Sequence, residues 1–142
     1  MLNATKPQSA AYAFNDSPVG LAAWIMSMMS SLSTGEEVER RFGRDELLTN
    51  IMIYWVTQTI GTSMRIAYDT RVSSQPATEK SPVPAGVAHC PGDAPLPREW
   101  AERKTHLIHF SELERGAHFA AWEAPEVWAE DFKSFAAKLA TA

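Results

Sequence analysis

The sequence predicts an α/β fold in which a helical N-terminal part precedes two parallel strands that alternate with helices. Residues 105–110 mix β-branched and apolar side chains, as a buried strand does. After a turn at Gly116, one helical stripe carries Trp128, Phe132, Phe135 and Leu139. The same order occurs upstream, with a strand at 83–90 and a short helix at 98–104. Strands joined by a helix are parallel, so we expect a right-handed crossover between them.

The N-terminal part is predicted to contain two or three helices. Ser17 can cap the first helix, with Pro18 at its first position and an apolar stretch at residues 19–29. Its expected inward face contains Leu21, Trp24, Ile25 and Met28. The polar residues 30–44 then link this helix to the next.

A second helix is predicted to begin at Asp45 and Glu46, because acidic side chains favour a helix N-terminus. Apolar positions follow at helical spacing at Leu47, Leu48, Ile51, Tyr54 and Trp55. We expect Gly61 to break or bend this helix, which leaves 62–68 as a separate helical turn. Residues 69–82, rich in Ser, Thr and Pro, are expected to form a loop.

Composition excludes several classes of function. The net charge of −4 gives no basic surface for nucleic acid, so we expect no nucleic-acid partner. No apolar run approaches the roughly 20 residues that a membrane span needs, and the first residues do not resemble a signal peptide. The single Cys90 excludes an internal disulfide and is typical of a reducing compartment. We therefore expect a cytoplasmic protein without a membrane span.

The most informative segment is the turn Gly116-Ala117-His118, which places a histidine between a strand and a helix. Asp93 lies in the loop after the preceding strand. In open α/β sheets these loops share the edge where ligands bind, so the two side chains could form a base and its orienting acid. Glu112 and Glu114 are alternatives for the acid, and each residue could instead be structural.

His106 and His109 raise the question of a metal site together with His118. Residues three apart on a strand point to opposite faces, so they cannot share a metal ion. We therefore expect no metal site here.

Several segments, taken in order, resemble epoxide hydrolases of the α/β-hydrolase fold, on the microsomal and juvenile hormone branch. The segments are Thr5-Lys6-Pro7-Gln8, residues 15–21, 45–50, Tyr54-Trp55 and 63–68, then Asp93, His118-Phe119-Ala120-Ala121 and the Glu-x-Pro-Glu of residues 123–126. The resemblance runs from about residue 5 to the end of the chain. It implies cap-derived helices and a return segment at 1–72, and the C-terminal β-α-β-α part of the hydrolase core at 73–142.

The resemblance also implies a chemistry. In this family an Asp nucleophile opens a small epoxide to a covalent ester, two cap tyrosines donate hydrogen bonds to the ring oxygen, and a His with an acidic partner activates water. Tyr68 matches the second tyrosine, Asp93 the acidic partner and His118 the base. No cofactor is implied.

The 142 residues depart from the family pattern in three respects. They contain no nucleophile elbow and no His-Gly-x-Pro oxyanion loop, and the first cap tyrosine would fall before Thr5. Tyr12 follows the Thr5 motif and is not assigned that role. We therefore expect the downstream part of a larger enzyme, inactive by itself, with a missing N-terminal half as partner. The alternative is a non-catalytic remnant or interaction module, and the coding region upstream would distinguish the two.

Overall fold

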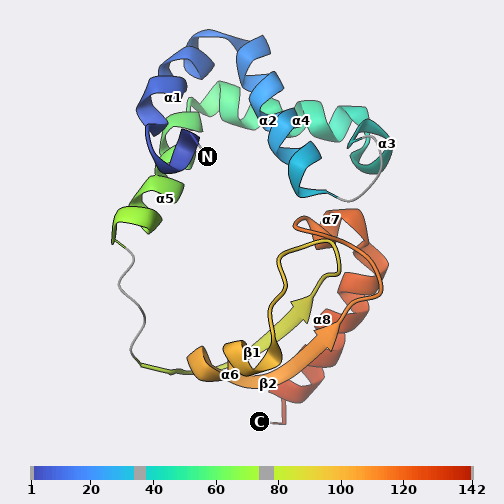
Figure 1. The fold of residues 1–142 in the computed structure, drawn as a ribbon. Helices are drawn as coiled ribbons and strands as arrows, with labels where there is room; N and C mark the ends of the chain where they lie inside the picture. The colour runs from blue at the N-terminus through green and yellow to red at the C-terminus, as the bar shows by residue number, and fades with distance from the viewer. Residues whose placement is uncertain (1, 34–37, 74–78, 142) are drawn as a thin grey trace. The chain divides into compact units, whose positions relative to one another are not determined.

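The computed structural model describes residues 2–33, 38–73 and 79–141. These residues form two compact units. The helical unit contains the elements from the N-terminus to α5, and the α/β unit contains the elements from β1 to α8 (Figure 1). None of the described helices is both long and apolar enough to cross a membrane.

The helical unit has more helices than the two or three predicted. Within the described residues it contains a 3₁₀ turn, η1 (Leu2–Ala4), and five α-helices: α1 (Pro7–Asp16), α2 (Pro18–Leu32), α3 (Val38–Phe42), α4 (Arg44–Thr57) and α5 (Ile60–Ser73). The helix α1 packs against α5. The predicted polar linker at 30–44 is wrong in part, because α2 extends into it and α3 lies within it. A five-residue helix is too short to show a hydrophobic period.

Helix α2 begins as predicted. The Ser17 Oγ accepts a hydrogen bond from the Gly20 backbone N–H at 3.0 Å, which caps the helix. Leu21, Ile25 and Met29 are its buried residues, at the i, i+4, i+8 spacing of one face. Met29 therefore takes the buried place predicted for Met28, and Trp24 is only half-buried, stacked on Phe14 at 5.3 Å between ring centroids.

The break between α4 and α5 lies three residues before the predicted position. Gln58 adopts a left-handed conformation with φ 55° and ends α4, while Gly61 lies inside α5. The Gln58 side chain also donates to the Trp55 carbonyl at 2.7 Å, so it satisfies one of the last helix carbonyls. The predicted loop at 69–82 is also wrong at both ends, because α5 continues to Ser73 and β1 begins at Ser81. Residues 74–78 of that loop lie outside the described residues.

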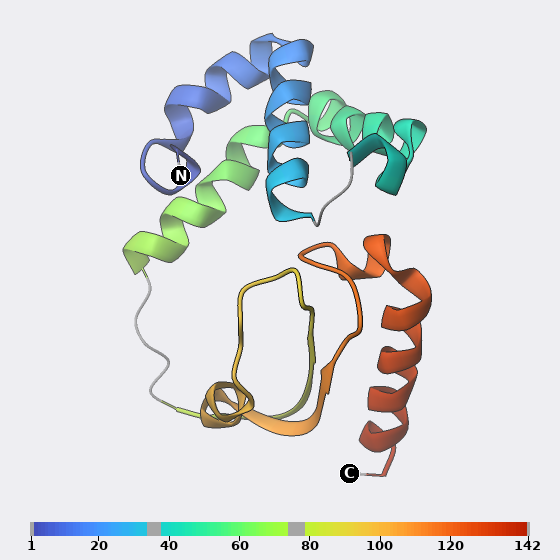
Figure 2. The same ribbon diagram turned by 45° about the vertical axis from the view of Figure 1, so that its right-hand side comes forward.

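The α/β unit has the predicted order. It contains β1 (Ser81–His89), α6 (Arg98–Lys104), β2 (Thr105–Glu112), α7 (Ala120–Glu123) and α8 (Pro125–Leu139). The two strands pair in parallel, with Gly86 opposite His109 and His89 opposite Glu112. Figures 1 and 2 both show α8 running along one face of this pair. The unit is therefore a β-α-β-α segment, consistent with part of an α/β fold.

The predicted stripe on α8 is only partly covered. Phe135 packs so closely on β1 that a Cβ at Gly86 would lie 2.7 Å from its ring. Trp128, Phe132 and Leu139 remain 36%, 51% and 45% exposed. Two strands offer too little surface to cover a four-turn helix, so half of the apolar face stays open to solvent.

Candidate functional site

The structure brings two of the predicted site residues together within the α/β unit. His118 Nδ1 lies 3.4 Å from Asp93 Oδ2, at the outer limit of hydrogen-bond reach. The two side chains are 51% and 43% exposed, so the pair lies at a surface that a small molecule can reach. Neither Glu112 nor Glu114 forms an ion pair with His118 among the described residues.

Asp93 is held by the turn that follows β1. Its backbone N–H donates to the Cys90 carbonyl at 3.1 Å, which closes the turn. Its Oδ1 accepts a hydrogen bond from the Ala94 N–H at 2.7 Å. With Oδ1 fixed in this way, Oδ2 is the carboxylate oxygen that faces the imidazole.

The turn that carries His118 is bonded through its backbone to the Asp93 turn. The Gly92 N–H donates to the Gly116 carbonyl at 3.1 Å, and the Leu113 N–H donates to the His89 carbonyl at 2.8 Å. Gly116 has a φ of +109°, which disfavours any residue with a Cβ. The close contact between the Asp93 turn and the His118 turn therefore depends on Gly116, two residues before His118.

Glu123 adds a contact that the sequence analysis did not identify. Its Oε1 accepts a hydrogen bond from the Phe119 N–H at 3.2 Å, directly after His118. The ring of Phe119 in turn packs edge-on against the His118 imidazole at 5.2 Å. A Glu four residues after Phe119 is the signal that could have indicated this contact.

A cavity of about 430 Å³ opens beside His118. Its lining includes Asp93 and the aromatic side chains of Phe119, Trp122 and Trp128. Cys90 also lies in the lining, and its pKa is raised by burial and, secondarily, by the nearby carboxylates of Asp93, Glu123 and Asp131. The Cys90 thiol is therefore held neutral and is a poor nucleophile.

His109 has polar partners that the sequence did not suggest. It is 6% exposed, and its Nε2 lies 2.8 Å from Asp131 Oδ1 while its Nδ1 lies 2.9 Å from Lys138 Nζ. The signal available in the sequence was the seven-residue spacing of Asp131 and Lys138, which places both on one face of α8. Within the described parts of the chain, no group of three or more His, Cys, Asp or Glu side chains is arranged to hold a metal ion.

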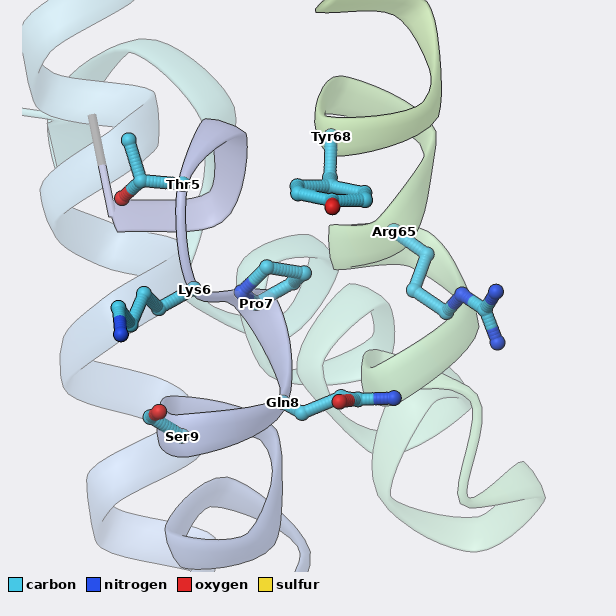
Figure 3. A pocket seen from close by; sticks show the side chains of 7 residues that line it. All are labelled: Thr5, Lys6, Pro7, Gln8, Ser9, Arg65 and Tyr68. Atoms are coloured by element: carbon cyan, nitrogen blue, oxygen red, sulfur yellow. The ribbon is translucent and has the colours of Figure 1, made fainter. Parts of the chain in front are cut away.

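Tyr68 lies on α5 in the helical unit, where it is 37% exposed. It lines a cavity of about 400 Å³ with Arg65 and the start of α1, residues 5–9 (Figure 3). Figure 3 shows the side chains of Lys6 and Arg65 pointing away from one another, so they do not converge on a charged group. The role of Tyr68 as a hydrogen-bond donor stays a prediction.

Known proteins are similar to this chain in sequence and in fold. No family model matches it. Epoxide hydrolase 1 of Sus scrofa is 40% identical over 148 residues, which cover 94% of this chain and 32% of that protein. The crystal structure of juvenile hormone epoxide hydrolase from the silkworm Bombyx mori superposes with a TM-score of 0.85 at 30% identity, over 99% of this chain and 39% of that one. The epoxide hydrolase of Aspergillus niger superposes with a TM-score of 0.78 at 25% identity, over 97% and 34%.

The chain thus spans about a third of the length of the curated relatives it matches. The predicted resemblance is confirmed by both kinds of comparison, and so is the predicted fold class. The described residues form helices and a two-stranded parallel sheet, which is consistent with part of that fold. In sequence and in structure, the chain is similar to the C-terminal part of an α/β-hydrolase-fold epoxide hydrolase of the microsomal and juvenile hormone kind.

Proposed function

We propose that the chain supplies the water-activating half of an epoxide hydrolase, an enzyme that converts an epoxide and water to a vicinal diol. The observation that carries the proposal is the 3.4 Å approach of Asp93 to His118 beside an open cavity. The similarity to epoxide hydrolases supplies the reaction class. In this proposal His118 is the base, Asp93 its acidic partner and Tyr68 one donor to the ring oxygen.

The proposed chemistry has two steps. A carboxylate nucleophile, which we place outside these 142 residues, attacks an epoxide carbon and breaks its C–O bond, which leaves an ester and an alkoxide. The Tyr68 hydroxyl donates a hydrogen bond to that oxygen as its charge develops. A water molecule then attacks the ester carbonyl and the acyl C–O bond breaks, so the nucleophile returns to a carboxylate. The two protons of the water end on the two oxygens of the diol, one of which was the alkoxide.

His118 acts in the second step. With Nδ1–H donating to Asp93 Oδ2, its Nε2 is free to remove a proton from the attacking water. General-base catalysis of this kind contributes roughly a hundred- to ten-thousandfold. The aromatic side chains of Phe119, Trp122 and Trp128 give the cavity beside this pair an apolar surface for an organic substrate.

The isolated 142-residue polypeptide should therefore not hydrolyse epoxides at a useful rate. Alignment of a nucleophile with the substrate accounts for on the order of 7 to 11 kcal/mol of barrier lowering, and His118 with Asp93 cannot replace it. We place the complete enzyme in the cytoplasm, and we expect a polypeptide with the upstream portion of the fold to be its partner. If the coding region upstream encoded an unrelated protein, the remnant alternative would gain instead.

A chimera tests the proposal. This chain replaces the matching third of Epoxide hydrolase 1 from Sus scrofa, and diol formation from styrene oxide is measured together with the covalent ester by mass spectrometry. We expect turnover from the chimera, and we expect His118→Gln to accumulate the ester without releasing diol. The matched control His106→Gln changes an exposed histidine on β2 and should leave turnover unchanged.

Two outcomes would contradict the assignment. The first is equal diol release by the chimera and its His118→Gln variant. The second is diol formation by the isolated chain, abolished in His118→Ala, which would show that no further nucleophile is needed.

A further inference from the structure

His109, Asp131 and Lys138 form a polar chain between β2 and α8 that the proposed mechanism does not use. His109 is 6% exposed and has a partner at each ring nitrogen. An ammonium group has only donors, so Lys138 Nζ donates to His109 Nδ1, and His109 Nε2 carries the proton that it donates to Asp131 Oδ1. A neutral imidazole therefore joins an ammonium and a carboxylate that both belong to α8.

This chain of contacts, the His109 relay, acts together with one apolar contact. Phe135 lies between Asp131 and Lys138 in sequence and on the same side of α8, and its ring centroid is 6.1 Å from that of His109. Phe135 also rests against Gly86 of β1. The helix α8 is consequently attached to β2 by the relay and to β1 by Phe135.

The position of α8 matters for the Asp93–His118 pair because of how the chain connects. The segment with His118 runs from the end of β2 to the start of α8, and Asp93 follows the end of β1. Both side chains of the pair are about half exposed, so little packing holds them directly. Besides the backbone hydrogen bonds between the two loops, their alignment depends on the strands and the helix to which the loops are joined.

We infer that His109 is a positioning residue for the Asp93–His118 pair: with Asp131 and Lys138 it fixes α8 on β2 and so holds the His118 imidazole toward Asp93. The inference rests on the proposed function, because that function assigns His118 the role of base and Asp93 the role of its acidic partner. A positioning role for His109 differs from a general stabilising role in one respect. Loss of the relay should change the surroundings of the His118 ring even while the protein stays folded.

The test uses the 142-residue chain labelled with ¹⁵N and the NMR signals of its four histidine rings. Asp93→Asn defines how far the His118 ring signals move when its partner carboxylate is lost. We expect His109→Gln to move the same signals in the same direction. The control His106→Gln alters an exposed histidine on the same strand and should leave the His118 signals in place.

A second pair of variants keeps the test decisive if His109→Gln fails to fold. Lys138→Met removes only the donor to Nδ1 at an exposed position of α8 and should cause a smaller shift in the same direction. Lys138→Arg retains a donor and should restore the wild-type signals. Unmoved His118 signals in folded His109→Gln, or in Lys138→Met, would overturn the inference and leave the proposed function intact. Unmoved signals in Asp93→Asn would instead overturn the pair itself, and with it both proposals.

Discussion

Replacement of Gly116 by alanine should lower the stability of the α/β unit and separate the two loops of the site. Gly116 has a φ of +109°, outside the region that a residue with a Cβ adopts readily. A new Cβ there would lie 3.5 Å from Ala120 Cβ and 3.9 Å from Ala124 Cβ, which are ordinary contacts. The cost therefore comes from the backbone conformation alone, and a residue forced into such a region costs about 1–3 kcal/mol.

Urea denaturation measures this cost. With a slope of about 1–3 kcal/mol per molar for a chain of this size, a loss of about 2 kcal/mol lowers the urea midpoint by about 1 M. We also expect weaker protection of the Gly92 amide from hydrogen exchange, since this amide donates to the Gly116 carbonyl. His118 should then lose its fixed approach to Asp93.

Gly61→Ala is the matched control, because it adds the same methyl group at a glycine with ordinary helical geometry. Gly61 lies in the first turn of α5, and its Cβ would be 3.6 Å from Ala11 Cβ. Alanine there should raise stability by up to about 1 kcal/mol. A Gly116→Ala variant as stable as the wild type would refute the argument from φ, and so would equal destabilisation by both substitutions.

Three further predictions concern packing, capping and ionisation. Gly86→Ala should destabilise the protein by about 1–3 kcal/mol in urea denaturation, because its Cβ would lie 2.7 Å from the Phe135 ring; an unchanged midpoint would show that the ring moves freely. Ser17→Ala should cost about 0.5–2 kcal/mol by the same assay, since it removes the hydrogen bond to the Gly20 N–H, while Ser17→Asp should retain most of the stability. Burial and, secondarily, nearby carboxylates such as Asp93 raise the pKa of the Cys90 thiol. The stability that the neutral thiol contributes should therefore be present below pH 9.0 and lost as the pH rises through the pKa of Cys90 in the folded state. Cys90→Ala should flatten that alkaline part of the stability profile, and an unchanged profile would contradict the assignment.

The strand at 105–110 and the helix after residue 124 could be predicted from the pattern of their apolar side chains and the turn between them. The strand at 83–90 and the helix at 98–104 could be predicted because they repeat the same order upstream. The break before α5 could not, because Gln58 rather than the glycine adopts the left-handed conformation there. Propensity favours glycine at such a position. At this site the Gln58 side chain and backbone both bond to the end of α4, which offsets the cost.

The Asp93–His118 pair could be predicted from the sequence, whereas the contacts that support it could not. Asp93 and His118 follow successive strands of one parallel pair, and that topology alone predicts that they share an edge. The bond from Gly92 to Gly116 and the partners of His109 join residues 22 to 29 positions apart in the chain. No local period encodes such contacts, because they depend on the depth to which α8 packs on the sheet.

The Asp93–His118 pair and the His109 relay differ in how far they are exposed to solvent. The Asp93–His118 pair is half exposed and is held by two backbone hydrogen bonds between loops, whereas His109, at the centre of the relay, is 6% exposed. A contact at 3.4 Å between two half-exposed side chains contributes little to stability by itself. The stability of this unit must therefore come from contacts such as Phe135 on Gly86 and the relay, and the pair is free to face the cavity. Substitutions at Asp93 should accordingly leave the unfolding midpoint nearly unchanged, while substitutions at His109 should lower it.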